Sequence, residues 1–366
     1  MFQVAMSTSP DSSPKRVSLR DIAKEVGVTH VTVSLALRNH PRISAEMRMK
    51  VQETAERLGY RPDPMLAALA NYRRGKSDHP ITSAIAWINA WPEPDILRSF
   101  REFDLYWKGA REAAEKFGYR LEEFRIGESN LSPQRLHEIL STRDIRGLLL
   151  PPHRHEPNWE NFPWSEYSVV RFGRSLRFPR AHLVTSDQVA NTLLAFTTMS
   201  ERGYERIGFV TTGGDLRRNG HLFEAGFLAA QREVDESRRV PILHLGELAA
   251  GPASARLAAW IKDHGVDAVY TDLPGVPSYL KKAGISCPGE IGLAATTVLD
   301  TGIDSGINQN PEETGRVGFL TLNALINDGT RGIPSLMRQI LVEGTWIDGT
   351  SLPLKPAKPP ARNKAH

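Results

Sequence analysis

Residues 18–40, SLRDIAKEVGVTHVTVSLALRNH, predict a helix, a tight turn and a second short helix. Ser18 is a good N-cap, and Asp21 follows in the first turn, where a carboxylate suits the positive end of the helix dipole. Gly27 stands where the first helix should end, because glycine adopts the left-handed C-cap conformation at little cost. Val33 and its helical neighbours can pack back on the first helix. This is the layout of a helix-turn-helix, whose second helix can enter the DNA major groove, although ordinary three-helix packing units share it.

A third helix is predicted over Ala45–Leu58, with Ser44 as its N-cap and Gly59 at its end. Thr29 can cap the second helix in the same way. The apolar face of the second helix points toward the other two, so its opposite side is free to meet a partner. The residues on that outward side are His30, Val31, Ser34 and Arg38.

Charge is unevenly distributed along the chain. Between Lys15 and Lys76 there are 13 Lys/Arg and 6 Asp/Glu, whereas the whole chain of 366 residues has a net charge of only +4. A basic N-terminal segment on a mildly acidic remainder is the electrostatic pattern of a protein that binds the phosphates of nucleic acid. The asymmetry therefore favours DNA binding over a simple packing role.

Three stretches of the N-terminal region carry a resemblance to a known family. They are VSLRDIAKEVGVTHVTVSLAL at 17–37, RIS at 42–44 and AERLGYRPDP at 55–64. Together they resemble the lactose-repressor (LacI/GalR) family of bacterial transcription regulators, and the resemblance continues more weakly to about residue 352. It implies a sequence-specific DNA-binding headpiece, a short hinge and a ligand-controlled core.

The resemblance implies which headpiece residues contact DNA. His30, Val31 and Ser34 would open the recognition helix and face base edges. Leu35 stands where the family often has arginine, and leucine can touch a thymine methyl but cannot make the bidentate guanine contact. The docking mode is thus predicted, but not the bases that are read. The full predicted set is Ser18, Leu19, Thr29, His30, Val31, Thr32, Ser34, Leu35, Arg38, Arg42, Ser44 and Leu69.

Residues Met65–Arg73, MLAALANYR, form a short alanine-rich stretch after the chain-breaking Pro62 and Pro64. The resemblance implies a hinge helix here, which orders on operator DNA and wedges Leu69 into the minor groove. Family members usually carry Ala-Arg before this leucine, whereas this chain has two alanines, so Arg73 and its neighbour could supply the phosphate contacts instead. The alternative is that these leucines pack between domains.

Composition limits the classes of protein that the chain can represent. The hydrophobic fraction of 40% and the mean hydropathy of −0.35 suit a soluble protein, and no apolar run approaches the 18 residues of a membrane span. The first 14 residues lack the features of a signal peptide, so residues 1–16 are expected to be a disordered lead-in, and Met6 could be the true start. Cys287 is the only cysteine, which excludes an internal disulfide, fits a reducing cytoplasm and predicts a buried small hydrophobe.

From Pro80 onward, short apolar runs alternate with helical patterns, which predicts parallel sheets covered on both faces. Doubly wound and barrel folds both remain open from this alternation alone. Strands are predicted at Ile81–Ile88, Arg120–Arg125, Gly147–Leu150, Ser168–Phe172, Arg206–Val210, Val240–Leu245, Ala268–Thr271 and Ile291–Ala295. Helices are predicted at Asp104–Phe117, Val189–Arg202, Leu222–Arg232, Ala253–His264 and Pro311–Asp328.

The resemblance decides between these folds. It implies an α/β core of two lobes, like periplasmic sugar-binding proteins, with parallel sheets and an effector in the cleft between the lobes. The chain would cross between lobes near Phe178–Asp187 and return near Val298–Pro311. Asp187 would stabilise the junction of the lobes.

Candidate effector residues lie at strand ends, where ligands bind in such folds. Asp272 ends a strand where the family carries an effector-binding aspartate, although it could instead cap the next helix. His221 stands where the family often has arginine, and Trp91 could stack on a sugar ring or simply be packed. The predicted effector set is Trp91, Phe172, Arg174, His221, Asp272 and Gln309.

Signatures of catalysis and of tightly held cofactors are missing from the sequence. There is no GxxxxGK[ST], GxSxG or HExxH motif and no dinucleotide fingerprint in the first strand–turn–helix. His153 and His155 are two residues apart, but no third residue has a suitable spacing for a metal ligand. We therefore expect no enzyme activity, no cofactor and no metal.

The sequence thus predicts an all-α helix-turn-helix headpiece followed by a two-lobed α/β core. The function expected is that of a cytoplasmic, nucleoid-associated transcription regulator of the repressor type, which binds a pseudo-palindromic operator as a homodimer under control of a sugar-like effector. The alternatives are a periplasmic-type solute-binding protein and an effector-independent DNA-binding protein. The expected divisions are a lead-in at 1–16, the headpiece at 17–63, a hinge helix and linker at 64–79, the effector-binding and dimerisation core at 80–352, and a disordered tail at 353–366.

Overall fold

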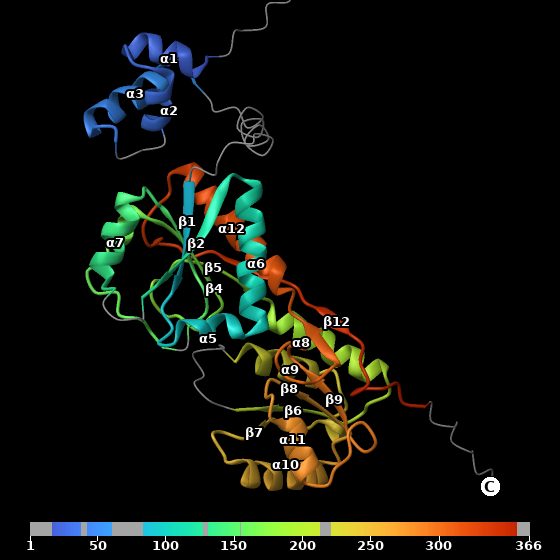
Figure 1. The fold of residues 1–366 in the computed structure, drawn as a ribbon. Helices are drawn as coiled ribbons and strands as arrows, with labels where there is room; N and C mark the ends of the chain where they lie inside the picture. Colours follow the sequence, from blue (N-terminus) through green and yellow to red (C-terminus); the bar gives the residue numbers. More distant parts are fainter. Residues whose placement is uncertain are drawn as a thin grey trace, which may run out of the picture. The chain divides into compact units, whose positions relative to one another are not determined.

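The computed structural model describes residues 17–37, 42–60, 83–126, 131–153, 155–212 and 221–356 (Figure 1). The chain divides into two compact units, Met1–His79 with Leu325–Thr330, and Pro80–Ala324 with Arg331–His366. We describe the headpiece in the first unit and the core in the second separately. The predicted lead-in, the hinge stretch and most of the predicted tail lie outside the described residues.

The headpiece consists of three short helices, α1 (Leu19–Val26), α2 (His30–Leu37) and α3 (Ala45–Arg57). Its small core takes one fully buried side chain from each helix in turn: Ile22, Val33 and Val51 are all 0% exposed. The predicted apolar stripes therefore do pack against one another. Because so few side chains make up this core, each of them contributes much of its stability.

Caps fix the ends of these helices. The backbone N–H and the hydroxyl of Ser18 both donate to the Asp21 carboxylate, at 2.8 and 2.7 Å. Gly27 has a φ of +81°, the left-handed conformation that the sequence predicts at the end of α1. Ser44 Oγ accepts from the backbone N–H of Met47 at 3.3 Å. The first two helices are thereby held at the turn that defines the motif.

The core contains two six-stranded sheets with the same strand order. The first runs β11-β5-β4-β3-β1-β2 and the second β12-β10-β9-β8-β6-β7, and all neighbouring strands are parallel except the antiparallel pair β10–β12. This repeat confirms two lobes of doubly wound α/β type and rules out the barrel. The first-lobe strands are β1 (Ser83–Asn89), β2 (Tyr119–Arg125), β3 (Gly147–Leu150), β4 (Ser168–Phe172), β5 (His182–Ser186) and β11 (Gln339–Val342). The second-lobe strands are β6 (Ile207–Thr211), β7 (Leu243–His244), β8 (Ala268–Thr271), β9 (Gly292–Ala295), β10 (Gly306–Asn308) and β12 (Thr345–Ile347).

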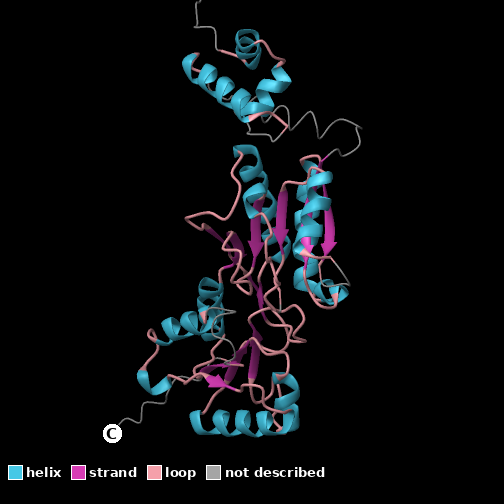
Figure 2. Ribbon diagram, turned by 90° about the vertical axis from the view of Figure 1, so that its left-hand side faces the viewer, coloured by secondary structure: helices cyan, strands magenta, loops and turns pink. Residues whose placement is uncertain are grey.

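Helices cover both faces of each sheet (Figure 2). In the second lobe, Val269 of β8 faces the cluster that contains α10 and α11, while its neighbour Tyr270 faces the cluster that contains α8 and α9. This alternation is what a strand buried between two helical layers requires. The helices are α5 (Pro94–Ser99), α6 (Arg101–Lys116), α7 (Pro133–Thr142), α8 (Gln188–Glu201), α9 (Leu222–Gln231), α10 (Ala250–His264), α11 (Val276–Lys282) and α12 (Pro311–Asp328), with 3-10 turns at Trp164–Glu166 and Glu236–Arg238.

The last helix, α12, packs on the first lobe although it follows the second-lobe strands. A Cβ added to Gly109 of α6 would lie 1.8 Å from the carbonyl oxygen of Glu312, and one added to Gly315 would lie 2.1 Å from that of Tyr106. The two helices thus approach backbone to backbone at two glycines. Only residues without a side chain allow this contact.

Three short crossovers join the lobes. They lie at Asp187, between β5 and α8, at residues 309–310, between β10 and α12, and at residues 343–344, between β11 and β12. The backbone N–H of Asp187 donates to Val342 O at 2.9 Å, and Asn310 Nδ2 donates to the carbonyl oxygen of Glu343 at 2.9 Å. These bonds tie the segment around the third crossover to the other two, and a junction role for the Asp187 side chain, which accepts from the backbone N–H of Ala190 at 3.0 Å, stays a prediction.

The predicted crossings need two corrections. Half of the first predicted crossing, Phe178–Asp187, is occupied by β5, so the chain leaves the first lobe only after Ser186. The return begins after β10, and the third crossover between β11 and β12 was not predicted. Short strands at the edge of a sheet carry too few residues for their periodicity to be recognised.

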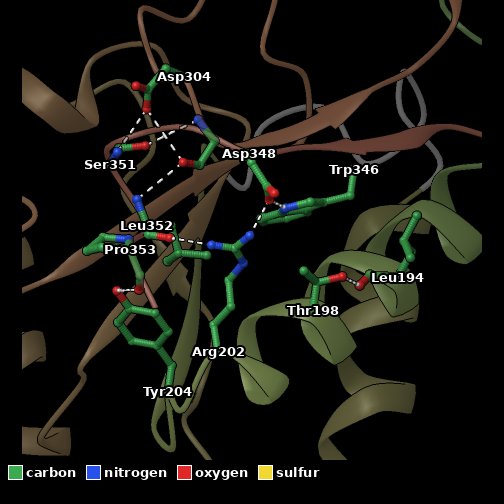
Figure 3. Close-up of polar contacts among 11 residues, drawn as sticks. Leu194, Thr198, Arg202, Tyr204, Asp304, Trp346, Asp348, Ser351, Leu352 and Pro353 are labelled. Carbon is green, nitrogen blue, oxygen red and sulfur yellow. Dashed lines mark hydrogen bonds and ion pairs between the residues drawn. The ribbon is translucent and has the colours of Figure 1, made fainter. Parts of the chain in front are cut away.

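The C-terminal segment is strapped onto the second lobe rather than forming a tail from residue 353 (Figure 3). The Arg202 guanidinium donates to Leu352 O at 3.1 Å and pairs with the Asp348 carboxylate, and the Tyr204 hydroxyl donates to Pro353 O at 2.9 Å. The Asp304 carboxylate accepts from the backbone N–H groups of Thr350 and Ser351 (2.7 and 2.9 Å), and these bonds hold its pKa well below the usual range despite burial. The predicted tail boundary is therefore wrong for the first residues after 352.

Two further findings concern single residues and hydropathy. Cys287 is exposed, so the prediction of a buried small hydrophobe is wrong. Among the described helices, none has both the length and the apolar character that a membrane span needs.

Candidate functional site

The N-terminal end of α2 presents its side chains to solvent. His30 is exposed, and Val31 is 54% exposed although it is a large apolar residue next to the headpiece core. The buried residues of the same helix, Val33 and Ala36, lie on its other face. An exposed β-branched side chain at the tip of a recognition helix suits contact with a base edge, for example a thymine methyl group.

Several of the predicted DNA-contacting residues already have a structural role. Thr29 Oγ1 accepts from the backbone N–H of Thr32 at 3.1 Å, and the two hydroxyls lie 2.9 Å apart. Leu19 is half-buried and packs against the headpiece core. Ser18 and Ser44 act as the caps described above. Their contacts with DNA stay predictions, and any such contact would come from residues whose position the helix ends already fix.

The remaining predicted DNA-contacting residues differ in how exposed they are to solvent. Arg42 is exposed at the turn before α3, and Ser34 and Leu35 are half-exposed on α2. Arg38 and Leu69 lie outside the described residues. The structure therefore brings most of the predicted set to one short helix and the turns around it.

In the second lobe, Asp272 lies directly after β8, beside the end of β6. Its Oδ2 accepts from the hydroxyl of Thr211 at 3.0 Å, and its Oδ1 is buried with no hydrogen-bond partner among the described residues. Burial raises the pKa of Asp272 to about 6, against the opposing effect of the Thr211 hydrogen bond. A buried carboxylate oxygen without a donor indicates a place for a ligand.

His221 lies close to this aspartate in the fold, at the start of α9. It has a φ of +47°, an uncommon conformation for a non-glycine residue, and its Nδ1 lies 3.1 Å from Glu224 Oε1. The same carboxylate oxygen lies 3.1 Å from Nε2 of His244, at the end of β7. His221 Nε2 is buried and has no partner among the described residues. Two histidines thus share one carboxylate at the carboxyl edge of the sheet.

Two of the predicted effector residues, Phe172 and Gln309, are packed or already hydrogen-bonded. Phe172 is 0% exposed and lies against Gly318 of α12, so it is packed in the core, and its effector contact stays a prediction. Gln309 is buried, with Oε1 accepting from Ser186 at 2.5 Å and Nε2 donating to Thr296 O at 2.8 Å, so both ends of its amide hold the crossover. These functions leave neither residue a free group for an effector.

Trp91 is 6% exposed and lies in an aromatic cluster of the first lobe. Its ring centroid is 5.8 Å from that of Phe100, and its indole N–H donates to Pro152 O at 2.9 Å. His153, in the same loop as Pro152, accepts from the backbone N–H of Ala90 through Nε2 at 2.9 Å, and burial lowers its pKa to about 4. These contacts fit a packed Trp91 better than a tryptophan that stacks on a sugar ring. The hydrogen bond of His153 connects its own loop to the loop that contains Ala90.

Arg174 lines a cavity at the first crossover. The cavity measures about 390 Å³ and is lined also by residues of the α8 N-terminus and by Leu222, the neighbour of His221. Burial lowers the pKa of the Arg174 guanidinium, and the charge of Asp187 opposes that shift. Arg174 therefore lies near the crossovers and not with Asp272.

Comparison with known proteins agrees with these observations. A family model described as bacterial regulatory proteins, lacI family, matches residues 18–63, the described headpiece almost in full. The transcriptional regulator PtxS of Pseudomonas putida is 25% identical over 329 residues, which cover 88% of this chain and 92% of that protein. The headpiece of this chain thus matches the lacI family. The transcriptional repressor CytR of Escherichia coli is also 25% identical to this chain, over 198 residues and about half of each protein (53% of each).

Solved structures share the fold of this chain. A transcriptional regulator CelR–cellobiose complex has a TM-score of 0.53 and 19% identity, and covers 92% of the chain and 100% of its own. The lac repressor dimer bound to operator and the anti-inducer ONPF has a TM-score of 0.50 and 15% identity, with 93% and 100% coverage. These likenesses support the headpiece and the periplasmic-binding-protein-like core. PtxS and CytR are described as a regulator and a repressor of transcription.

Some residues of the core site were not predicted from the sequence. Glu224 lies one helical turn after His221, so helical spacing could have paired the two. Thr211 and His244 meet Asp272 and Glu224 only because β6, β7 and β8 are neighbours in the sheet. Sequence spacing carries no signal for that adjacency.

Asp272→Asn should stabilise the unliganded core at neutral pH. Because the folded-state pKa of about 6 lies above the ordinary 3.8, the ionised carboxylate disfavours folding, and stability falls as pH rises from about 4 to 6. Partial exposure to solvent reduces the effect, so we expect a gain of about 1–2 kcal/mol at pH 7.5. Urea unfolding at pH 4.0 and 7.5 checks this: the variant should gain stability over wild type at pH 7.5 only. An equal change at both pH values would contradict the assignment.

Proposed function

We propose that this protein binds a pseudo-palindromic operator as a homodimer and that a small sugar-like molecule, bound at the strand ends of the core, controls this binding. The observation that carries the proposal is the exposed N-terminal end of α2, on a capped three-helix headpiece that matches the lacI family. The basic charge of the N-terminal segment supports it, because phosphate contacts supply much of the affinity for DNA. The similar lac repressor dimer is bound to operator, and the similar CelR is in complex with cellobiose.

A homodimer follows from the geometry of operator recognition. One helix-turn-helix reads only a few base pairs, so two headpieces related by a two-fold axis are needed to read two half-sites. In this proposal residues 64–79 form the hinge helix, and Leu69 of each subunit inserts into the central minor-groove step. Repression is the regulatory sign that we favour, with the protein in the cytoplasm on the nucleoid.

Control by a ligand would act through the crossovers. Asp187, residues 309–310 and residues 343–344 connect the two lobes, and hydrogen bonds tie the segment around the third crossover to the other two. A ligand that binds one arrangement of the lobes better shifts the equilibrium toward it, and thereby changes the affinity for DNA. The coupling must be reciprocal, so operator DNA should change the affinity for the ligand by the same factor.

Gel shift and thermal shift together test the proposed function. We expect the full chain to shift duplex DNA, with an affinity that falls steeply as salt is raised. We also expect at least one member of a sugar panel to raise the melting temperature and to change DNA affinity. Failure to bind duplex DNA would contradict the DNA-binding part, and intact DNA binding without any stabilising ligand would favour the effector-independent alternative.

His30→Ala should relax sequence preference more than it weakens binding to random DNA. His30 is exposed at the start of α2, where a side chain meets base edges and not the phosphates. We expect a loss of about 1–3 kcal/mol on a selected operator and little change on random duplex. Competition gel shifts measure both affinities, with His155→Ala, at an exposed histidine of the core, as the matched control. An equal loss on both DNAs would remove the base-reading role of His30.

A further inference from the structure

The strand ends of the second lobe bring together four titratable side chains. Asp272, His221, Glu224 and His244 come from the loop after β8, the start of α9 and the end of β7. Glu224 Oε1 lies 3.1 Å from a ring nitrogen of each histidine, and the charges of Glu224 and His244 both act on the pKa of Asp272. We call these four residues the acid–histidine cluster.

Hydrogen-bond chemistry determines what this cluster still lacks. Ionised Glu224 can only accept, so His221 Nδ1 and His244 Nε2 must carry the hydrogens that point at it. Asp272 Oδ1 is an acceptor, and both this oxygen and His221 Nε2 are buried without a partner among the described residues. The cluster therefore needs a ligand that supplies donors.

The charges of the cluster limit the class of ligand further. The cluster contains two carboxylates: Glu224 faces both histidines, whereas in the described part of the chain no Lys or Arg forms an ion pair with Asp272. The nearby cavity does contain Arg174, but Asp187 lines the same cavity and its charge acts on that arginine. An anionic ligand would meet like charges at the cluster, whereas a cation would relieve the cost of burying them.

A second pair of acids lies at the strand ends of the core. Asp300, which follows β9, accepts from the backbone N–H of Glu102 at 3.3 Å, and the Tyr106 hydroxyl donates to Glu102 Oε1 at 3.2 Å. Burial, together with the charge of Asp300, raises the pKa of Glu102 to about 7, although the Tyr106 hydrogen bond opposes the shift. In the described part of the chain, neither Glu102 nor Asp300 forms an ion pair with a Lys or Arg, as is also the case for Asp272.

We infer that the acid–histidine cluster binds a ligand with a protonated amine, such as an amino sugar, in preference to neutral sugars, sugar acids or sugar phosphates. An ammonium group brings donors and a positive charge, so it can both donate to Asp272 Oδ1 and compensate the charge of that carboxylate. A hydroxyl group can donate the same hydrogen bond but leaves the charge of Asp272 uncompensated. The inference rests on the proposed function, since it names the ligand class of the proposed effector site.

A thermal-shift panel on the full chain at pH 7.5 and constant ionic strength tests the inference. The panel contains D-glucosamine, D-galactosamine, D-glucose, D-galactose, D-glucuronate and D-glucose 6-phosphate. We expect an amine-bearing member to give the largest rise in melting temperature. A larger rise with any neutral or anionic member, or no rise with either amine, would overturn the inference.

Two variants assign the preference to the cluster. Asp272→Asn should weaken binding of the preferred amine at least about tenfold while changing the affinity for the matching neutral sugar less. Asp263→Asn makes the same charge change at an exposed carboxylate of α10 and should leave both affinities unchanged. An amine preference that survives Asp272→Asn would overturn the assignment.

DNA binding separates this inference from the proposed function. If a sugar acid or phosphate stabilises the protein and changes its affinity for duplex DNA, the ligand class is wrong but ligand-controlled DNA binding stands. If no panel member does either, both the ligand class and the effector control fail. If duplex DNA is not bound at all, the proposed function fails whatever the panel shows.

Discussion

Gly315→Ala is expected to lower the free energy of unfolding of the core by about 3 kcal/mol or more. An added Cβ at this position would lie 2.1 Å from the carbonyl oxygen of Tyr106 and 2.9 Å from its Cα, so it meets the backbone of α6 and not the end of a flexible side chain. The helices α6 and α12 would have to move apart. That movement would also loosen the packing at Gly318, where the ring of Phe172 lies as close.

Chemical denaturation of the full chain measures this loss. Gly251→Ala is the matched control, because this glycine is also helical, in α10, and its nearest neighbour atom would lie 3.4 Å from the new Cβ, at the end of the flexible Lys282 side chain. That variant should be neutral or slightly stabilised, since alanine is the better helix former. Equal stability of the Gly315 and Gly251 variants would refute the close packing of α6 and α12.

Val33→Asp is expected to abolish DNA binding without unfolding the core. Val33 is fully buried among the small set of apolar side chains that hold the headpiece together. An unpaired charge there costs several kcal/mol, more than so small a core can be expected to supply. Operator affinity should therefore fall at least about 100-fold, to the level of non-specific binding.

The neighbouring Val31 provides the control for that experiment. It lies two residues earlier on the same helix but is 54% exposed, so Val31→Thr should keep the headpiece folded and change only which sequences bind best. Fluorescence anisotropy gives the DNA affinity, and a melting curve of the core shows that the second unit is intact. Operator binding by Val33→Asp at wild-type affinity would contradict the headpiece structure.

The helix ends of the headpiece could be predicted from the sequence because the capping contacts are local. Ser18, Gly27 and Ser44 act through neighbours a few residues away, so their spacing alone gave the helix ends, which the structure confirms. The strands β3, β4 and β8 and the helix α12 match their predicted ranges, because each is a continuous run with one type of pattern. The strands β5, β10, β11 and β12 were missed: β5 falls in the stretch assigned to the first crossing, β10 and β12 have only three residues, and β11 and β12 are mostly exposed edge strands.

The core site was harder to predict because its residues meet only through the fold. Phe172 ends a strand, where ligands sit in such folds, but α12 returns from the other lobe and covers it. Gln309 was placed correctly on a crossover, yet sequence could not show that Ser186 and Thr296 would take both ends of its amide. The pairing of His244 with Glu224 likewise depends on β6 and β7 lying side by side.

Selection of binding sites from a random double-stranded DNA library by the full chain tests directly whether the protein is a dimeric, sequence-specific regulator. We expect enrichment of one sequence with two inverted half-sites, because two headpieces related by a two-fold axis bind together. The Val33→Asp variant should enrich nothing. Enrichment of a single asymmetric site, or no enrichment by the wild-type chain, would contradict a dimeric, sequence-specific regulator.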